Sequence, residues 1–140
     1  MQSNEEHGLI IARLITEEDI FQSLKEICRK HEVVNAIILS AIGQIKQFTL
    51  GFFTGKEYLS QDFINIHELL SIQGMISWSA QENDYQFHLH AVVGNEEKQA
   101  FGGHLFKGKV QVTNEIVILK THIKVKRKKE ETGLLGLYLD

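Results

Sequence analysis

The stretch Phe87–Lys107, FHLHAVVGNEEKQAFGGHLFK, contains the most regular strand pattern in the sequence. Residues 85–93 alternate between two faces. The apolar face is Tyr85, Phe87, Leu89, Ala91 and Val93, and the other face is Gln86, His88, His90 and Val92. Because the apolar face is complete without the histidines, we expect His88 and His90 to lie together on the opposite face of a half-buried strand.

A third histidine ends the same stretch. Gly102 and Gly103 precede His104 and allow backbone conformations that other residues avoid, so we expect a glycine-shaped turn to present this imidazole. Three neighbouring imidazoles suit a divalent metal such as zinc, with water, a carboxylate or a partner group in the fourth position. The alternative is a hydrogen-bonded polar cluster on the wet side of the strand or at a subunit interface.

One segment outside this stretch has a helical pattern. Residues 17–31, EEDIFQSLKEICRKH, place apolar residues at helical spacing and end in basic residues that suit the helix dipole. Thr16, with Asp19 three residues later, resembles a capping box at the start of this helix. We interpret Cys28, the only cysteine, as a buried structural thiol in a reducing cytoplasm.

The remaining segments are mostly extended and predict roughly seven or eight strands. Gly43 interrupts the branched residues 35–53, which indicates a bulge or a tight corner. Since strands and helices do not alternate as in a parallel sheet, we predict an α+β fold. It would combine a mostly antiparallel sheet, one main amphipathic helix and short extra helical turns. We expect residues 1–7 to be flexible and residues 8–140 to form a single domain.

Composition narrows the possible functions. The chain of 140 residues has a net charge of −3, which argues against strong nonspecific DNA binding by this chain alone. No apolar run is long enough to span a membrane, and the first residues do not resemble a signal peptide, so we expect a cytoplasmic protein.

A basic run near the end of the chain is the candidate for DNA contact. Its members are Lys124, Lys126, Arg127, Lys128 and Lys129. They could bind phosphates, although Glu130 and Glu131 follow directly and partly neutralise them. The alternative interpretation is a solvated strand edge that lysines protect from further pairing.

Several motifs together resemble the plants-and-prokaryotes-conserved (PPC) domain, which occurs alone in bacteria and archaea and behind AT-hook motifs in plant nuclear proteins. The resemblance covers about residues 8–139. It rests on EDIFQSLKEICRKHEV, ILSAIGQIKQFTLGFF, HELLSIQGMIS and, most strongly, FHLHAVVGNEEKQAFGGHLFKGKVQVTNEIVI. Three motifs are specific for this domain in combination, namely H-x-H, then G-G-H-L, then a glutamate in a strand.

The resemblance implies a homotrimer built from adjacent antiparallel sheets. It also implies that His88, His90 and His104 form a metal site, and that Glu115 is the family's acidic position. Glu115 would orient a histidine through a hydrogen bond or act as an acid/base group. The alternative is a carboxylate on a strand face that a backbone group or a lysine satisfies. No Arg-Gly-Arg-Pro core is present, so the AT-hook of the plant proteins is missing.

The leading hypothesis is a stand-alone, DNA-binding or transcription-associated trimeric module with a three-histidine metal site, acting on DNA or a DNA-bound protein. A second hypothesis is a metal-dependent enzyme or small-molecule binder. The sequence favours a function without catalysis, because no nucleophile or general base accompanies the histidines. A third is a purely structural interaction trimer, for which replacing His88 or His90 by Ala would leave every interaction intact.

Overall fold

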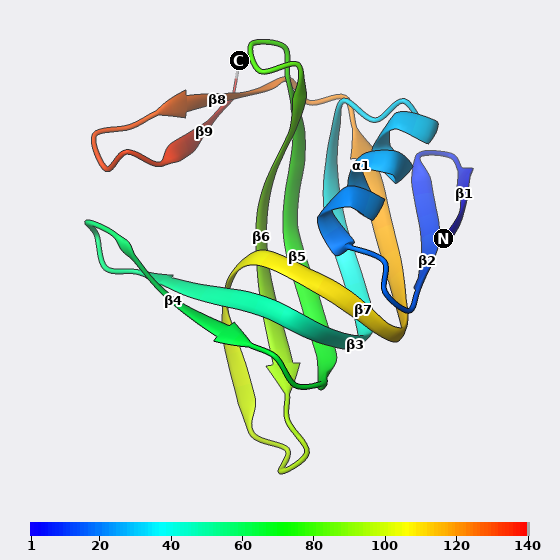
Figure 1. Ribbon diagram of the computed structural model, residues 1–140. Helices are drawn as coiled ribbons and strands as arrows, with labels where there is room; N and C mark the ends of the chain where they lie inside the picture. Colours follow the sequence, from blue (N-terminus) through cyan, green and yellow to red (C-terminus); the bar gives the residue numbers. More distant parts are fainter. Residues whose placement is uncertain (140) are drawn as a thin grey trace.

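The computed structural model describes residues 1–139, which form nine strands and one helix (Figure 1). The α+β prediction is confirmed. The elements are β1 (Gln2–Glu6), β2 (Leu9–Ile15), α1 (Ile20–Lys30), β3 (Asn35–Phe53), β4 (Tyr58–Phe63), β5 (His67–Ser79), β6 (Asp84–Gly94), β7 (Ala100–Thr121), β8 (Val125–Lys129) and β9 (Leu135–Leu139).

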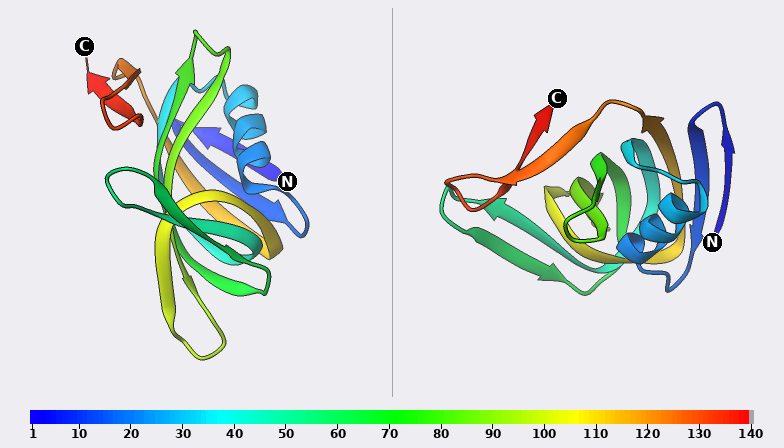
Figure 2. Two further views of the ribbon diagram at one scale, coloured as in Figure 1. Left: turned by 60° about the vertical axis from the view of Figure 1, so that its left-hand side comes forward. Right: turned by 90° about the horizontal axis from the view of Figure 1, so that it is seen from above.

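Seven strands form one antiparallel sheet in the order β1-β2-β7-β6-β5-β3-β4. Strand β3 also pairs with β7, so that β3, β5, β6 and β7 form a closed ring. Viewed from above, the sheet curves around a central space, and α1 lies in the curve beside β2 (Figure 2). Closure removes free edges from the four ring strands.

The ring depends on two long, bent strands. Gly43 lies at a register shift within β3 and has a φ of +143°, a conformation that suits glycine. A Cβ atom there would overlap the carbonyl oxygen of Thr113 on β7. The predicted corner at Gly43 is therefore present, but it bends one continuous strand and does not separate two.

Helix α1 begins later than the capping pattern predicts. Asp19 is the N-cap, and its Oδ1 accepts a hydrogen bond of 2.9 Å from the backbone N–H of Gln22. Thr16 lies outside the helix because Glu17, at a φ of +72°, turns the chain and donates its N–H to the Val110 carbonyl. The predicted start at Thr16 is wrong, and the predicted apolar face is confirmed, with Leu24 and Ile27 fully buried.

A single core lies between α1 and the inner face of the sheet. Phe48 is fully buried and stacks on Phe63 at a centroid distance of 4.7 Å. Burial of a side chain of this size contributes about 1.5–3 kcal/mol. Cys28 is also buried, as predicted, and burial raises the pKa of its thiol to about 12, which makes it unreactive.

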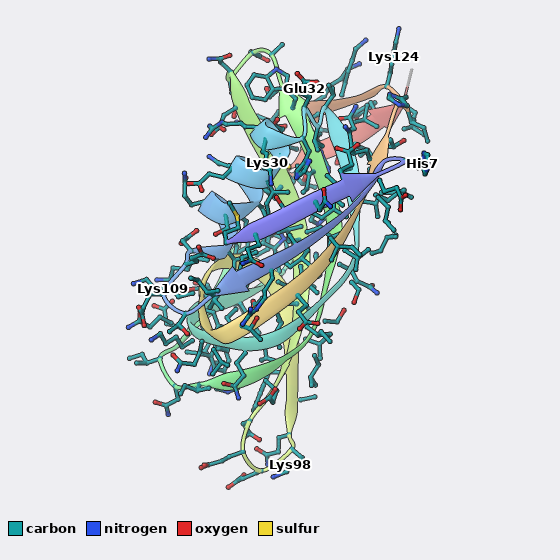
Figure 3. All side chains as sticks on the ribbon, turned by 90° about the vertical axis from the view of Figure 1, so that its right-hand side faces the viewer. His7, Lys30, Glu32, Lys98, Lys109 and Lys124 are labelled. Carbon is teal, nitrogen blue, oxygen red and sulfur yellow. The ribbon has the colours of Figure 1, made fainter. Side chains whose placement is uncertain are left out.

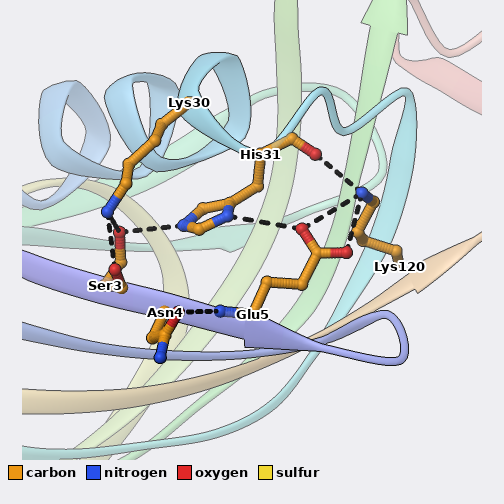
Figure 4. A network of polar contacts seen from close by, with 6 residues as sticks. All are labelled: Ser3, Asn4, Glu5, Lys30, His31 and Lys120. Atoms are coloured by element: carbon orange, nitrogen blue, oxygen red, sulfur yellow. Dashed lines mark hydrogen bonds and ion pairs between the residues drawn. The ribbon is translucent and has the colours of Figure 1, made fainter.

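Residues 2–6, within the segment for which the sequence predicts flexibility, form strand β1 at the edge of the sheet. Glu5 on β1 lies 3.0 Å from the ammonium of Lys120 and 3.3 Å from His31 Nδ1 (Figure 4). The other ring nitrogen of His31 lies 2.9 Å from Ser3 Oγ. These side-chain contacts attach the polar edge strand β1 to the end of α1 and to β7. The sequence of β1 lacks apolar residues and therefore does not predict this attachment.

The chain ends in a hairpin outside the main sheet. Strands β8 and β9 pair with each other and form a separate two-stranded sheet. Apart from α1, residues 1–139 contain no helix, so the expected extra helical turns are absent. Within this described part of the chain, no helix has the length and apolar character needed to cross a membrane.

Candidate metal centre

Two of the predicted ligands lie side by side on β6. Leu89 and Ala91 are buried, whereas His88 and His90 are exposed on the opposite face of the strand. The alternation that the sequence predicts is therefore confirmed. The Nε2 atoms of the two imidazoles are 3.1 Å apart.

Strand pairing brings the third histidine to the other two. His104 lies directly opposite His90 in the β6–β7 register, with the ring centroids 5.4 Å apart. His104 thus comes from a strand and not from the expected glycine-shaped turn. The double glycine has another function, since a Cβ on Gly103 would lie 2.7 Å from the Gly51 carbonyl oxygen. Glycine here lets β7 and β3 approach each other closely.

The three side chains have the spacing of a ligand set. One nitrogen from each of His88, His90 and His104 lies within 4.8 Å of the others. Tetrahedral zinc with nitrogen ligands at 2.0–2.1 Å would require separations of about 3.3 Å, so modest side-chain rotations would suffice. In addition, His104 Nδ1 is buried and has no hydrogen-bond partner within residues 1–139. A buried nitrogen of this kind is costly unless something binds it.

The environment favours the neutral form of two of these imidazoles, His88 and His104. The pKa of His104 is lowered to about 4, mainly by burial and then by repulsion of its charged form from His88 and His90. The pKa of His88 is also lowered, first by burial and then by His90 and Arg127. Neutral imidazole is the form that binds metal, so both rings are ready ligands at neutral pH.

The cluster opens into a cavity of about 310 Å³. Tyr58 and Phe106 pack beside the His104 ring, with centroid distances of 5.2 and 4.7 Å. The turn between β8 and β9 closes one side, near the tip of the β3–β4 hairpin (Figures 1 and 2). The cavity is lined by Tyr58, Gln86, Phe87, His88, His104, Arg127, Gly133, Leu134 and Leu135.

Glu115 lies elsewhere in the chain. It is exposed on β7 and pairs in register with Arg13 of β2 and Ile42 of β3. Eleven residues separate it from His104 along the same strand, a path of about 36 Å. Within one chain, Glu115 is therefore not placed to orient a histidine or to act on a molecule in the cavity.

The basic run divides between two environments. Lys124, Lys126, Lys128 and Lys129 are exposed, whereas Arg127 is half-buried in the lining of the histidine cavity. Lys128 lies 4.8 Å from the centre of the Tyr138 ring. Figure 3 shows Lys124, of the basic run, and Lys98 at opposite ends of the molecule.

Of the cavity residues, the sequence predicts only His88 and His104 as members of this site, and it places neither Tyr58 nor Arg127 beside them. Alternation within β8 could have separated Arg127 from its neighbours Lys126 and Lys128, since consecutive strand residues face opposite sides. Nothing in the local sequence shows that the C-terminal hairpin returns to β6, because that contact is not local.

Comparison with solved structures supports the fold. A plant- and prokaryote-conserved (PPC) protein from Pyrococcus horikoshii is 29% identical, with a TM-score of 0.81 over 96% of this chain and 91% of its own. A candidate DNA-binding protein from Bacteroides thetaiotaomicron gives a TM-score of 0.88 at 23% identity, over 99% and 96% of the two chains. A metal-containing protein from Archaeoglobus fulgidus gives 0.80 at 24% identity, with the same shares covered. At these last two identities, the likeness shows the fold alone.

Two curated relatives share part of their sequence with this chain. Both are the bifunctional protein GlmU of Synechococcus strains, and they are 26% identical over 132 residues and 31% identical over 109 residues. The chain spans only 20% and 16% of their lengths, so the similarity concerns one region of a larger protein. The model of the Plants and Prokaryotes Conserved (PCC) domain matches residues 1–122, most of the chain and all three histidines. The chain therefore belongs to the PCC domain family, which is the plants-and-prokaryotes-conserved (PPC) family that its sequence motifs indicate.

Proposed function

We propose that this PCC-domain chain binds a divalent metal, zinc by preference, through His88, His90 and His104. The observation that carries the proposal is the cluster itself, three imidazoles with one nitrogen each within 4.8 Å and a buried, unpartnered Nδ1 on His104. A buried nitrogen without a partner is uncommon in a hydrogen-bonded polar cluster. Three protein ligands leave one coordination position for water or another molecule from the cavity.

The cavity supports binding better than hydrolysis. A metal in an open site supplies Lewis acidity and acidifies a bound water. The lining residues include no carboxylate that could act as a general base, and Glu115 lies far along β7. We therefore assign the site a binding or structural function within a regulatory module, and keep a metal-dependent enzyme as the alternative.

Metal analysis tests the site. The protein would be stripped with a chelator, incubated with zinc, desalted and measured by mass spectrometry, alongside His104→Ala and the control His122→Ala. We expect one zinc per chain in the wild type and the control, and an affinity at least 100-fold lower for His104→Ala. Equal zinc content in His104→Ala and the wild type would refute the proposal.

Exposed apolar side chains support the homotrimer as a second part of the proposal. The register of β2, β7 and β3 places several of them on one outward face, namely Leu9, Ile11, Ile37, Ile42 and Leu119. Ile11 is 60% exposed, and large apolar patches usually mark an interface. Multi-angle light scattering should give three times the chain mass, and Ile11→Lys should shift it towards the monomer. Ile64→Lys, at a loop residue that is 77% exposed, is the control. A monomeric wild type would refute the trimer.

DNA association is the remaining part of the proposal, and the four exposed lysines near β8 favour it. Three copies in a trimer would present twelve, which could offset the negative net charge locally. A mobility-shift assay at about physiological salt should show retention that Lys128→Gln/Lys129→Gln weakens. Absence of any shift for the wild type would remove DNA from the proposal. The buried, unpaired Cys28 fits the proposed cytoplasmic location.

A further inference from the structure

The C-terminal hairpin brings an arginine to the histidine cavity. Arg127 on β8 lines the same cavity as His88 of β6 and His104 of β7. The family model ends at residue 122, so the hairpin that carries Arg127 lies beyond the matched region. Figure 1 shows how this becomes possible, because the hairpin leaves the end of β7 and crosses to the side of β6 where β4 also lies.

The guanidinium of Arg127 is only partly satisfied. One N–H donates to the Leu135 carbonyl oxygen at 3.3 Å, across the hairpin. No carboxylate within residues 1–139 forms an ion pair with Arg127, although a guanidinium offers five N–H donors. Burial lowers the pKa of Arg127, and a half-buried cation without a counterion costs free energy unless an anion joins it.

The remaining lining fits a small anionic molecule. It contains no aspartate or glutamate, while Tyr58 and Gln86 add uncharged polar groups. Leu134 and Leu135 add apolar side chains to the lining. A volume of about 310 Å³ is at the lower end of the range for small-molecule sites.

We propose that this cavity binds a small molecule bearing an oxyanion, a carboxylate or a phosphate group, between the histidine cluster and Arg127. The proposal rests on the metal site proposed above. One oxygen would occupy the open coordination position, and the others would accept hydrogen bonds from the guanidinium, whose planar fork matches carboxylate and phosphate oxygens. Arg127 is in this view a ligand-binding residue and not part of a DNA-binding stripe.

Cobalt(II) in place of zinc gives a direct readout, because its visible spectrum changes when a ligand enters the coordination sphere. The full-length protein would be loaded with cobalt, its metal content measured, and then titrated separately with inorganic phosphate and with butyrate. We expect a saturable spectral change with at least one of the two anions, and the stronger of them identifies the class. Isothermal titration calorimetry supplies the dissociation constants.

Arginine variants connect the anion to the hairpin. Arg127→Gln should weaken binding at least tenfold while retaining one cobalt per chain. Arg127→Lys, which keeps the charge without the fork, should give intermediate affinity and guards against a hairpin that fails to form. Lys129→Gln is the control, because it removes the same charge from the same strand outside the cavity, and it should change affinity less than twofold.

The outcomes separate the two proposals. Failure to bind any metal would remove the metal site and, with it, this inference. Metal binding without a response to either anion would overturn only the inference. Equal anion affinity in Arg127→Gln and the wild type would also overturn the inference and leave the metal site intact.

Discussion

His104 should make the metal-free protein lose stability in mild acid. The pKa of His104 is about 4 in the folded protein, below the ordinary histidine value of 6.5. The unfolded chain therefore binds a proton at His104 more readily than the folded protein does. Stability that is present above pH 6.5 is therefore lost as the pH falls towards 4. The experiment lowers the pH from 7 to 4.5 and compares the wild type with His104→Gln, which has no titrating side chain at position 104.

The magnitude follows from the two pKa values. Between pH 6.5 and 4.5 the two states differ by nearly one proton at this site, and each pH unit corresponds to about 1.36 kcal/mol. The upper limit is thus about 2.5 kcal/mol. Because the His104 ring is only half-buried, solvent screening reduces it, and we expect roughly 1–2 kcal/mol.

Urea denaturation in EDTA at the two pH values measures this difference. The wild type should lose roughly 1–2 kcal/mol more than His104→Gln. All other titrating groups, including the salt-bridged Asp84 whose pKa Lys25 lowers, are common to both proteins and cancel. The control His122→Gln should lose as much stability as the wild type. Equal losses in His104→Gln and the wild type would refute the reasoning.

Three further predictions concern the fold, and all can be measured by urea denaturation. Gly43→Ala should cost about 3 kcal/mol or more, because the new Cβ would overlap the Thr113 carbonyl, whereas Gly55→Ala, with open space around it, should cost only about 1 kcal/mol. Phe48→Ala should cost about 3–5 kcal/mol, whereas the 70% exposed Phe52→Ala should cost less than about 0.5 kcal/mol. Asp19→Ala should cost about 1 kcal/mol through loss of the N-cap, and an equal effect at the loop residue Glu96 would contradict that explanation.

The sequence predicts those parts of the site that depend on local periodicity. Alternation over residues 85–93 correctly placed His88 and His90 off the core face. The helix face of α1 was predicted for the same reason, because Leu24 and Ile27 repeat at helical spacing. Both inferences depend only on neighbours within the same element.

The errors arise where distant segments meet. His104 comes to His90 through strand register, which no local pattern encodes, so the turn that the preceding glycines predict is absent and a strand takes its place. The contacts of strand β1 could not be predicted locally either, because Glu5 meets His31 and Lys120, residues remote in the chain. The position of Arg127 in the cavity likewise depends on the return path of a hairpin beyond the main sheet.

The closed ring has a consequence for synthesis on the ribosome. Strand β7 is the last of the four ring strands to be made, yet it completes the pairing of both β3 and β6. Asn35 pairs with Thr121, so β3, although it can pair earlier with β4 and β5, cannot complete its pairing with β7 until nearly the whole chain has emerged. A nascent chain that stops before Ala100 has unpaired strand edges and no complete metal-ligand set. Such contacts between distant residues slow folding, and they make the unfinished chain prone to aggregation until β7 arrives.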